Sequence, residues 1–292
     1  MKNGLAIVNA YVILPGAQHF YERMTEELAK RGVTLHLSTN AQIFSYIDSK
    51  GNLSGTKPDV DFVLYLDKDL FASYMLEMKG LRLFNSARSI ELCDDKMLTH
   101  LALANQGIKM PKTISGPLNY STEENPDFVK NLEKEFSFPF VAKENFGSLG
   151  REVFLLNNHE DLVKNEKELG HSPRLYQEFI ASSRGHDFRL IVVGGKYVTG
   201  MKRSSDNGDF RSNIGLGGHG EKVEMPKAYI EMAEKAAKIL QLDYCGIDLL
   251  EGPTGEPILD EVNSNAFIEG IEKVTGMNVA GAYADFIVKT IY

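Results

Sequence analysis

Hydrophobic and polar positions along the first 90 residues predict strands and helices that follow one another in turn. Short apolar runs predict buried strands at 5–14, 33–37, 62–66 and 81–84. Between them, residues 17–31 and 70–79 carry apolar side chains at helical spacing. Strand, helix and strand at this spacing are typical of βαβ units. We therefore expect an N-terminal α/β domain with a parallel sheet over residues 1–90.

The pattern changes in the rest of the chain, where strands and helices do not alternate strictly. Strands are predicted at 138–143, 152–156, 174–180, 187–193, 196–202, 244–251 and 257–263. Helices are predicted at 94–106, 159–169, 226–240 and 278–292. Such an order indicates an α+β fold. The stretch 49–58 is expected to be a turn-rich loop, and 204–220 a mobile loop or one that a ligand orders.

Composition and charge exclude several classes of protein. Hydrophobic residues make up 43% of the 292 residues and charged residues 25%, which is the usual globular mix. The formal net charge of −8 argues against binding nucleic acid through phosphate attraction. No run of 18 apolar residues is present, so no membrane span is expected. The two cysteines, Cys93 and Cys245, exclude a disulfide framework and favour a reducing, cytoplasmic compartment.

The dinucleotide-binding fingerprint is missing where it would matter. No GxGxxG follows the first predicted strand. Residues 215–220 match the pattern literally, but they neither follow a strand nor open a helix. A Rossmann dehydrogenase is therefore not expected.

Three oxygen-bearing side chains near the C-terminus give the strongest chemical signal. Glu261 and Asn263 are two residues apart, so on a strand they share a face, while Asp260 is expected to point to the other side. Asp248 lies on the preceding predicted strand and is expected opposite them. Oxygen ligands of this kind suit magnesium held between protein and phosphates. The alternative is a polar strand end with a solvated acidic patch.

Upstream segments carry features that suit an anionic nucleotide. Lys143 ends a predicted strand before the small-residue turn 147–150, an arrangement that can cradle a phosphate, although an ordinary hairpin turn would look the same. The strand 176–180, followed by Asp187, could hold a nucleoside or be a plain strand with a charged end. Cations at 202–203 and 211 flank the glycine-rich loop and suit phosphoryl groups, unless they form a solvated basic loop.

Taken together and in this order, these pieces resemble the ATP-grasp superfamily, and within it the RimK-type ligases (the ribosomal-protein-modification and alpha-L-glutamate ligase family). The segments that carry the resemblance are 93–96, Lys143 with its glycine loop, 177–180, 185–189, 208–213, 217–218, Asp248, 261–264, 269–272, 275–276 and 280–281. The resemblance implies an ATP-grasp domain over 91–292, with a lid subdomain over about 110–178 and a catalytic subdomain over about 179–292. Residues 1–90 would then be the variable pre-ATP-grasp domain.

The resemblance also implies roles for individual side chains. ATP phosphates would be contacted by Lys96, Lys143, Gly147, Ser148 and Gly150. Adenine and ribose would be held by Glu178, Phe179, Ile180 and Asp187. The triphosphate and the reacting end would be covered by Arg211, Ser212 and Asn213. Two Mg²⁺ ions, for which Mn²⁺ could substitute, would be bound by Asp248, Glu261 and Asn263. The acyl phosphate would be stabilised by Arg203 and Arg211.

The activity implied by the resemblance is an ATP- and magnesium-dependent carboxylate–amine ligation, through an acyl phosphate, that releases ADP. The implied partners are ATP, an amino acid and a carboxylate acceptor, which is a protein C-terminus, a peptide or a metabolite; a homo-oligomer is left open. Residues 263–267 read Asn-Ser-Asn-Ala-Phe where related ligases often read Asn-Ser-Ser-Pro-Gly, so glutamate as the added amino acid is left open. The alternative is a non-catalytic ATP-binding sensor of the same fold.

Overall fold

The computed structural model describes residues 2–120, 125–147, 150, 152–205, 208–212 and 217–292. Its N-terminal sheet has the order β2-β1-β5-β6, and all paired neighbours are parallel. The strands are β1 (Lys2–Val8), β2 (Val33–Thr39), β5 (Phe62–Tyr65) and β6 (Leu83–Phe84), and the helices between them are α1 (Pro15–Ala29) and α2 (Leu70–Met78). The predicted parallel α/β arrangement is confirmed.

The first strand is shorter than its apolar run predicts. β1 ends at Val8, and residues 9–14 form a loop in which Tyr11 is 93% exposed. The side-chain oxygen of Asn9 accepts hydrogen bonds from the backbone N–H groups of Tyr11 and Val12. This local bonding turns the chain away from the sheet, because an asparagine can replace strand pairing by a turn of its own.

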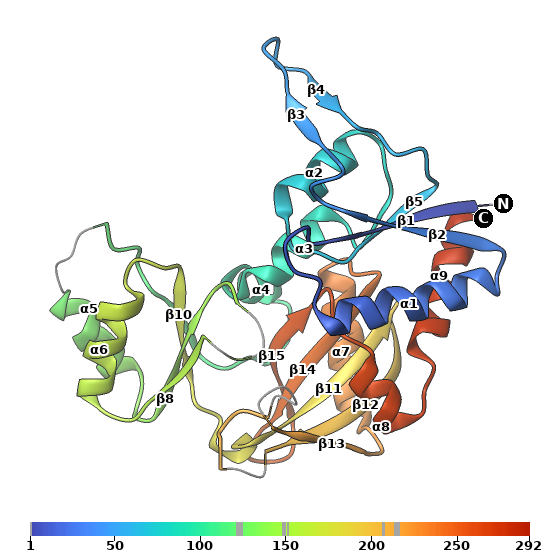
Figure 1. Ribbon diagram of the computed structural model, residues 1–292. Helices are drawn as coiled ribbons and strands as arrows, with labels where there is room; N and C mark the ends of the chain where they lie inside the picture. The colour runs from blue at the N-terminus through green and yellow to red at the C-terminus, as the bar shows by residue number, and fades with distance from the viewer. Residues whose placement is uncertain (1, 121–124, 148–149, 151, 206–207, 213–216) are drawn as a thin grey trace.

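A small hairpin occupies part of the segment predicted as a loop. Strands β3 (Ser45–Ile47) and β4 (Leu53–Gly55) pair antiparallel and project from the N-terminal sheet (Figure 1). Lys79 at the end of α2 anchors the base of the hairpin, because its ammonium donates to the hydroxyl of Ser45 and to the carbonyl of Thr56.

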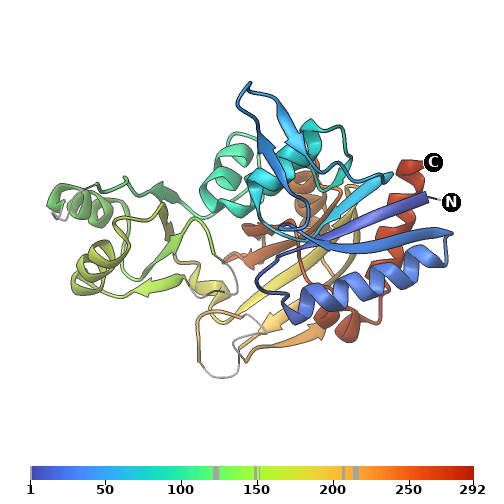
Figure 2. The same cartoon turned by 45° about the horizontal axis from the view of Figure 1, so that its top comes forward.

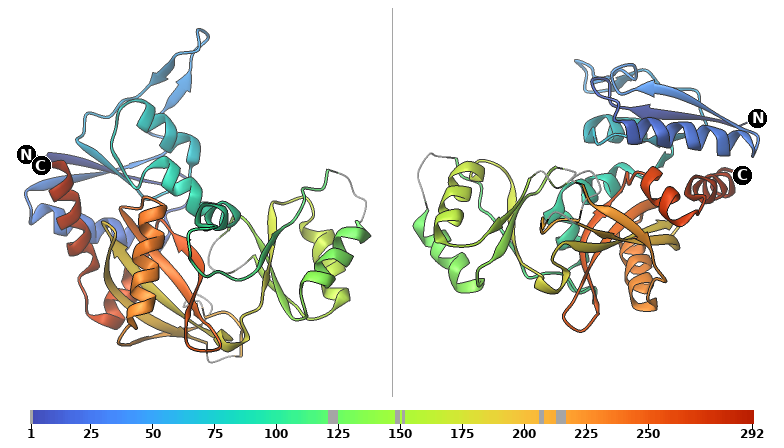
Figure 3. Two further views of the ribbon diagram at one scale, coloured as in Figure 1. Left: turned by 180° about the vertical axis from the view of Figure 1, so that it is seen from behind. Right: turned by 60° about the horizontal axis from the view of Figure 1, so that its bottom comes forward.

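Residues 113–178, which we call the middle module, form a lobe with its own antiparallel sheet (Figures 1 and 3). The strand order is β7-β10-β8-β9, with β7 (Thr113–Ser115), β8 (Phe140–Glu144), β9 (Val153–Leu156) and β10 (Arg174–Glu178). Helices α5 (Pro126–Glu135) and α6 (His159–Leu169) cover one face and share a core with Phe140 and Tyr176. Alternation along β8 then turns Val141 and Lys143 to the other face.

The C-terminal sheet has the order β13-β12-β11-β14-β15, all antiparallel. Its strands are β11 (His186–Val193), β12 (Lys196–Ser204), β13 (His219–Lys222), β14 (Tyr244–Glu251) and β15 (Pro257–Asn263). Helix α7 (Lys227–Ile239) covers one face, where it packs on Leu190 and Ile247. The connecting helices are α3 (Ala87–Asp94), α4 (Lys96–Leu103), α8 (Glu269–Thr275) and α9 (Val279–Ile291), and Ala181–Ser183 forms a 3₁₀ turn.

The opposite face of the C-terminal sheet shares one hydrophobic core with the N-terminal sheet. An aromatic cluster marks this joint, because Phe20 of α1 lies 5.2 Å from Tyr244 of β14, and Tyr244 lies 4.8 Å from Tyr283 of α9, between ring centroids. Helices α1 and α9 run side by side there (Figure 2). Among the described residues, no helix is long and apolar enough to span a bilayer.

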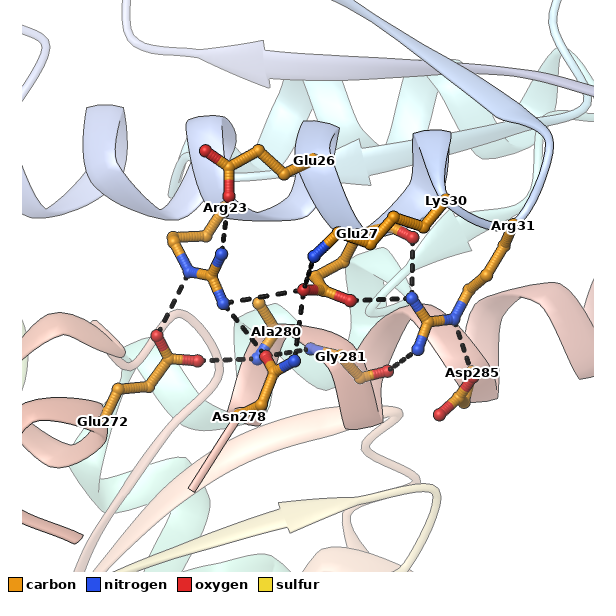
Figure 4. A network of polar contacts seen from close by, with 10 residues as sticks. All are labelled: Arg23, Glu26, Glu27, Lys30, Arg31, Glu272, Asn278, Ala280, Gly281 and Asp285. Atoms are coloured by element: carbon orange, nitrogen blue, oxygen red, sulfur yellow. Dashed lines mark hydrogen bonds and ion pairs between the residues drawn. The ribbon is translucent and has the colours of Figure 1, made fainter. Parts of the chain in front are cut away.

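A polar network closes the edge of this shared core (Figure 4). Glu27 of α1 is 3% exposed and accepts hydrogen bonds from Lys30, Arg31 and Asn278. Hydrogen bonds from Lys30 and then Arg31 lower the pKa of Glu27 to about 2, against the opposing effect of its burial. Arg31 also pairs with Asp285 of α9 at 2.6 Å, so the network ties the first helix to the last.

Candidate functional site

A pocket lies between the inner face of the middle module and the C-terminal sheet. Most of the predicted site residues line it: Lys96, Lys143, Gly147, Gly150, Glu178, Phe179, Ile180, Asp187, Arg203, Arg211, Ser212, Asp248 and Glu261. Asn263 lines an adjoining cavity that also contains Glu261. Ser148 and Asn213 lie outside the described residues. The structure thus brings together residues that are up to 165 positions apart, from Lys96 to Glu261, while their roles stay predictions.

A row of alternating charges crosses the C-terminal sheet at the floor of the pocket. Strand register places Arg203 opposite Asp187, Arg189 opposite Asp248, and Asp248 opposite Glu261. The Arg203 guanidinium donates to Asp187 at 2.6 Å and lies 3.0 Å from Asp248. These groups share a face because Asp187 and Arg189 are two residues apart on one strand. Their mutual pairing allows several charges to be buried together.

Asp248 is the most strongly held carboxylate of this row. It is 3% exposed and accepts hydrogen bonds from Arg189, one of them at 2.7 Å. Burial acts against its charge, but the positive charges of Arg189 and Arg203 outweigh that effect and lower the pKa of Asp248 to about 2. The side chain is therefore an anion at neutral pH, the form in which a carboxylate ligates a cation.

The expected outward orientation of Asp260 is wrong. Asp248 pairs with Glu261, but the next residue, Leu249, pairs with Leu259, so Asp260 is the extra residue of a β-bulge. The bulge breaks the strict alternation of side chains and lets Asp260 and Glu261 both line the pocket. Lys143 of the middle module donates to Asp260 at 2.6 Å. This pair joins the two walls of the pocket.

Lys96 reaches the pocket from the first turn of α4. Asp95 caps this helix, because its side chain accepts from the backbone N–H groups of Met97 and Leu98. The Lys96 ammonium lies 3.3 Å from the carbonyl oxygen of Gly147 and 3.8 Å from a carboxylate oxygen of Glu261. One lysine therefore spans the glycine turn and the acidic strand. The helix predicted over 94–106 corresponds to α4, and its first residue, Lys96, enters the site.

The other end of the pocket is apolar and aromatic. Phe179 follows β10 and its ring lies 6.3 Å from that of Phe210, between centroids. Arg211 donates to the carbonyl of Gly150, and so links the loop after β12 to the glycine turn after β8. Glu178 accepts weakly from the backbone N–H of Lys112 at 3.4 Å. Flat rings beside backbone edges offer a surface on which a planar base can lie.

A neutral histidine supports the wall behind Lys143. Gln177, which lines the pocket, meets the ring of His100 at 2.8 Å. Burial, and next the charge of Lys143, lower the pKa of His100 to about 4. The ring is therefore neutral at pH 7 and adds no positive charge beside the lysine.

The oxygen-bearing side chains fit magnesium as a partial set of ligands. Oxygens of the substrate would supply the rest. Asp248 and Glu261 face each other across paired strands, and the Asn263 amide lies 3.5 Å from the carboxylate of Asp248. Among the described residues, no group of three or more His, Cys, Asp or Glu side chains could hold an ion by itself. Magnesium commonly uses one or two carboxylates and takes its remaining ligands from phosphates and water. Two carboxylates and one carboxamide match that chemistry.

Two residues of the site were missed by the reasoning from sequence. Asp260 was set aside because bulges leave no mark in the alternation of apolar and polar residues. Arg189 was given no role, although an arginine two positions after Asp187 in an otherwise apolar strand is a visible signal. Only the register of β11 on β14 shows that this arginine holds Asp248.

Comparison with known proteins agrees with this fold. The family model for the RimK-like ATP-grasp domain matches residues 93–287. A probable alpha-L-glutamate ligase of Maridesulfovibrio salexigens is 37% identical over 216 residues, which cover 73% of this chain and 69% of that protein. Human beta-citrylglutamate synthase B is 34% identical over 223 residues, 75% of this chain, and the match spans 56% of the human protein's length.

A solved structure extends the likeness to the N-terminal sheet. The ATP-grasp ligase PsnB, complexed with a phosphomimetic variant of its minimal precursor, Mg and ADP, matches with a TM-score of 0.70 at 16% identity. The match covers 100% of this chain and 99% of that chain, and at this identity it concerns the fold. The chain belongs to the RimK-like ATP-grasp family. Several of its relatives are named as ligases and synthases, which confirms the prediction of an enzyme of the ligase class.

Proposed function

We propose that the protein uses ATP and two Mg²⁺ ions to join a carboxylate to an amine through an acyl phosphate. The observation that carries the proposal is the convergence of Lys96 and Lys143 with Asp248, Glu261 and Asn263 around one pocket and the cavity beside it. Lysine ammonium groups suit the phosphates of ATP, and the oxygen-bearing side chains suit magnesium. Magnesium, when bound, would neutralise phosphate charge.

The residues of the chain would act by position and charge. The carboxylate substrate must approach the γ-phosphate although both are anions, so cations are needed at the point of contact. Lys96 and Lys143 line the pocket from two walls and Arg203 lies at its floor, so these cations would surround that point of contact. Stabilisation of developing charge by groups already in place is the largest catalytic effect expected in such a site. The amine then displaces phosphate and leaves an amide.

The division of the chain into domains is also a proposal. We propose a pre-ATP-grasp domain over 1–90, a lid over about 110–178 and a catalytic subdomain over about 179–292. The separate core of the middle module supports the lid, because a unit with its own core can change position without unfolding. A lid over the pocket would keep water from the acyl phosphate.

The substrates are proposed only as classes. Relatives named for glutamate ligation and citrylglutamate synthesis support an amino acid as the amine and a carboxylate as the acceptor. The acceptor is a protein tail, a peptide or a metabolite. A cytoplasmic location remains a prediction.

The test of the proposal compares Glu261 within β15 with Glu256, the residue just before that strand. Wild-type protein is incubated with ATP, Mg²⁺ and a cell extract, and ADP and new amide products are measured by mass spectrometry. Glu261→Gln is expected to lose at least about 100-fold in ADP release, because it removes a charged ligand at the reacting phosphates.

Glu256→Gln serves as the matched control, since Glu256 pairs with Lys109 at the turn before β15 and does not line the pocket. It is expected to keep its activity within about twofold. Equal activity of the two variants, or ADP release by neither the wild type nor the control, would refute the proposed function.

A further inference from the structure

A second cavity of about 220 Å³ adjoins the pocket and shares Glu261 with it. The cavity lies where the carboxyl ends of β1 and β5 meet the loop that follows β15. It is therefore placed to hold a molecule that reacts at the phosphates. Arg189 and Asn263 also line the second cavity, so it starts at one end of the row of charged side chains on the C-terminal sheet.

One wall of this cavity is apolar and belongs to the loop that β1 leaves unpaired. Val12, Ile13 and Leu14 line it, and they are 58%, 44% and 42% exposed. Three consecutive apolar side chains held partly open at a cavity mouth are costly unless something covers them, since each exposes area that water solvates poorly.

Phe267 completes the apolar wall from the other side. Its ring packs on Gly16 at the start of α1, so closely that a Cβ atom added there would fall 2.5 Å from the ring. The neighbouring residue Asn265 donates to the backbone carbonyl of Asp67 at 3.1 Å. These contacts fix the segment after β15 against the N-terminal sheet. The segment is the one in which the chain departs from the Asn-Ser-Ser-Pro-Gly pattern.

Each cation that lines the cavity among the described residues already has a carboxylate partner. Lys68 pairs with Asp94 at 2.5 Å, and Arg189 pairs with Asp248. Asp67, by contrast, accepts its recorded side-chain hydrogen bonds from neutral donors, namely Asn9, Asn40 and the backbone N–H of Lys68. Its burial raises the pKa of Asp67, as expected for a carboxylate that lacks a cationic partner.

We propose that the second cavity binds the amine substrate, and that it selects an amino acid with an apolar side chain rather than glutamate. This inference rests on the proposed function. The surplus of carboxylates favours the ammonium group, and the wall of Val12, Ile13 and Phe267 receives the apolar side chain. The α-carboxylate is common to all amino acids and does not discriminate between them, whereas an acidic side chain would add a second carboxylate near Asp67 without a free cation to compensate it.

A competition experiment tests this choice without knowledge of the acceptor. Wild-type protein, ATP, Mg²⁺ and a cell extract are mixed with equal amounts of isotope-labelled leucine, isoleucine, methionine, phenylalanine, glutamate and aspartate. Every competitor meets the same acceptor, and fragmentation of the new products selects those in which the labelled amino acid is attached through its amine, so these report the amine site. We expect the apolar amino acids to exceed the acidic ones by at least about tenfold, the factor that about 1.4 kcal/mol of difference provides.

Ile13→Arg sharpens the test, because it adds a cation to the wall at a partly exposed position. It is expected to shift the ratio toward glutamate by about tenfold or more. The matched control is Phe71→Arg, at a side chain of α2 that is 76% exposed and does not line the cavity. The control is expected to leave the ratio unchanged, and thermal unfolding of both variants establishes that they fold.

The outcomes separate this inference from the proposed function. Glutamate or aspartate as the main label in the wild type, an unchanged ratio in Ile13→Arg, or ADP release without any incorporated label would overturn the apolar amine site and leave a ligase. Absence of both ADP release and label would remove the proposed function and this inference with it.

Discussion

The N-terminal sheet and the middle module are attached to the C-terminal sheet in different ways. The N-terminal sheet shares a continuous apolar core with it, reinforced by the buried contacts of Glu27. The middle module has its own core and meets the C-terminal sheet through the ion pair Lys143–Asp260 and the contact of Arg211 with Gly150. Apolar joints fix geometry, whereas polar joints across a pocket change with what fills it. We infer that the second cavity, proposed for the amine, is fixed and that the pocket proposed for the nucleotide is adjustable.

Substituting one phenylalanine in each core tests whether the two cores are distinct. Phe20→Ala, in the shared core, and Phe140→Ala, in the core of the middle module, should each cost about 3–5 kcal/mol through a lost contact and a cavity. Hydrogen exchange measures where the loss appears. Phe20→Ala should raise exchange in both the N-terminal and C-terminal sheets, and Phe140→Ala only over residues 113–178. Exchange that rises across the whole chain in Phe140→Ala would show one cooperative unit instead.

Substitutions at Lys143 and Asp260 test the ion pair between the middle module and the C-terminal sheet. Lys143→Met keeps most of the length of the unbranched side chain but removes its charge, so ADP release should fall about 10²–10³-fold, as when a group that stabilises the transition state is lost. Asp260→Asn removes the partner of Lys143 without removing the cation, and should cost much less. Steady-state rates at saturating ATP decide between them. Equal losses in the two variants would mean that the ion pair itself, rather than the lysine, serves the reaction.

Acidification should lower the free energy of unfolding by protonating Glu27, which holds α1 against the segment before α9. The pKa of this side chain is about 2 in the folded chain and 4.5 ordinarily, so its contribution is complete above about pH 5 and is lost as the pH falls toward 2. The difference corresponds to about 3 kcal/mol at most. Urea unfolding of the wild type at pH 7 and pH 3.5, compared with Glu27→Gln, measures it. The variant should be less stable at pH 7 and lose less on acidification; parallel losses would exclude Glu27 as the source.

Of the variants considered, the one that breaks the exposed ion pair Lys109–Glu256 is expected to lose the least free energy of unfolding. The pair joins the turn between β14 and β15 to the segment before β7, outside both cores. Lys109→Ala should change the free energy of unfolding by less than about 1 kcal/mol, because solvent screens the pair. A loss as large as that of Phe20→Ala would show that surface charge, and not apolar area, joins these elements.

Much of the fold could be predicted from sequence because local periodicity is strong where an element buries one face. The helix over 159–169 and the strands over 244–251 and 257–263 lie where the pattern places them. The helix α5 (Pro126–Glu135) was not predicted. The hairpin of β3 and β4 was missed because its short strands bury little, so burial imposes no alternation on them.

The residue types of the candidate site could be predicted from sequence, but the orientation and pairing of their side chains could not. Lys143 and Glu261 stand in ordered motifs, so their types and order along the chain are visible. The orientation of Asp260 depends on a bulge, and the function of Arg189 depends on strand register, and neither is written in local periodicity. The second cavity draws residues from five segments of the chain, so only the folded chain shows that its cations are already paired.

The most direct test of the central claim is a crystal structure of the protein with Mg²⁺ and the non-hydrolysable ATP analogue AMPPNP. The account predicts a triphosphate within hydrogen-bond distance of the ammonium groups of Lys96 and Lys143, with magnesium between the phosphates and the oxygens of Asp248, Glu261 and Asn263. A nucleotide bound elsewhere, or ions that touch none of these three side chains, would contradict it.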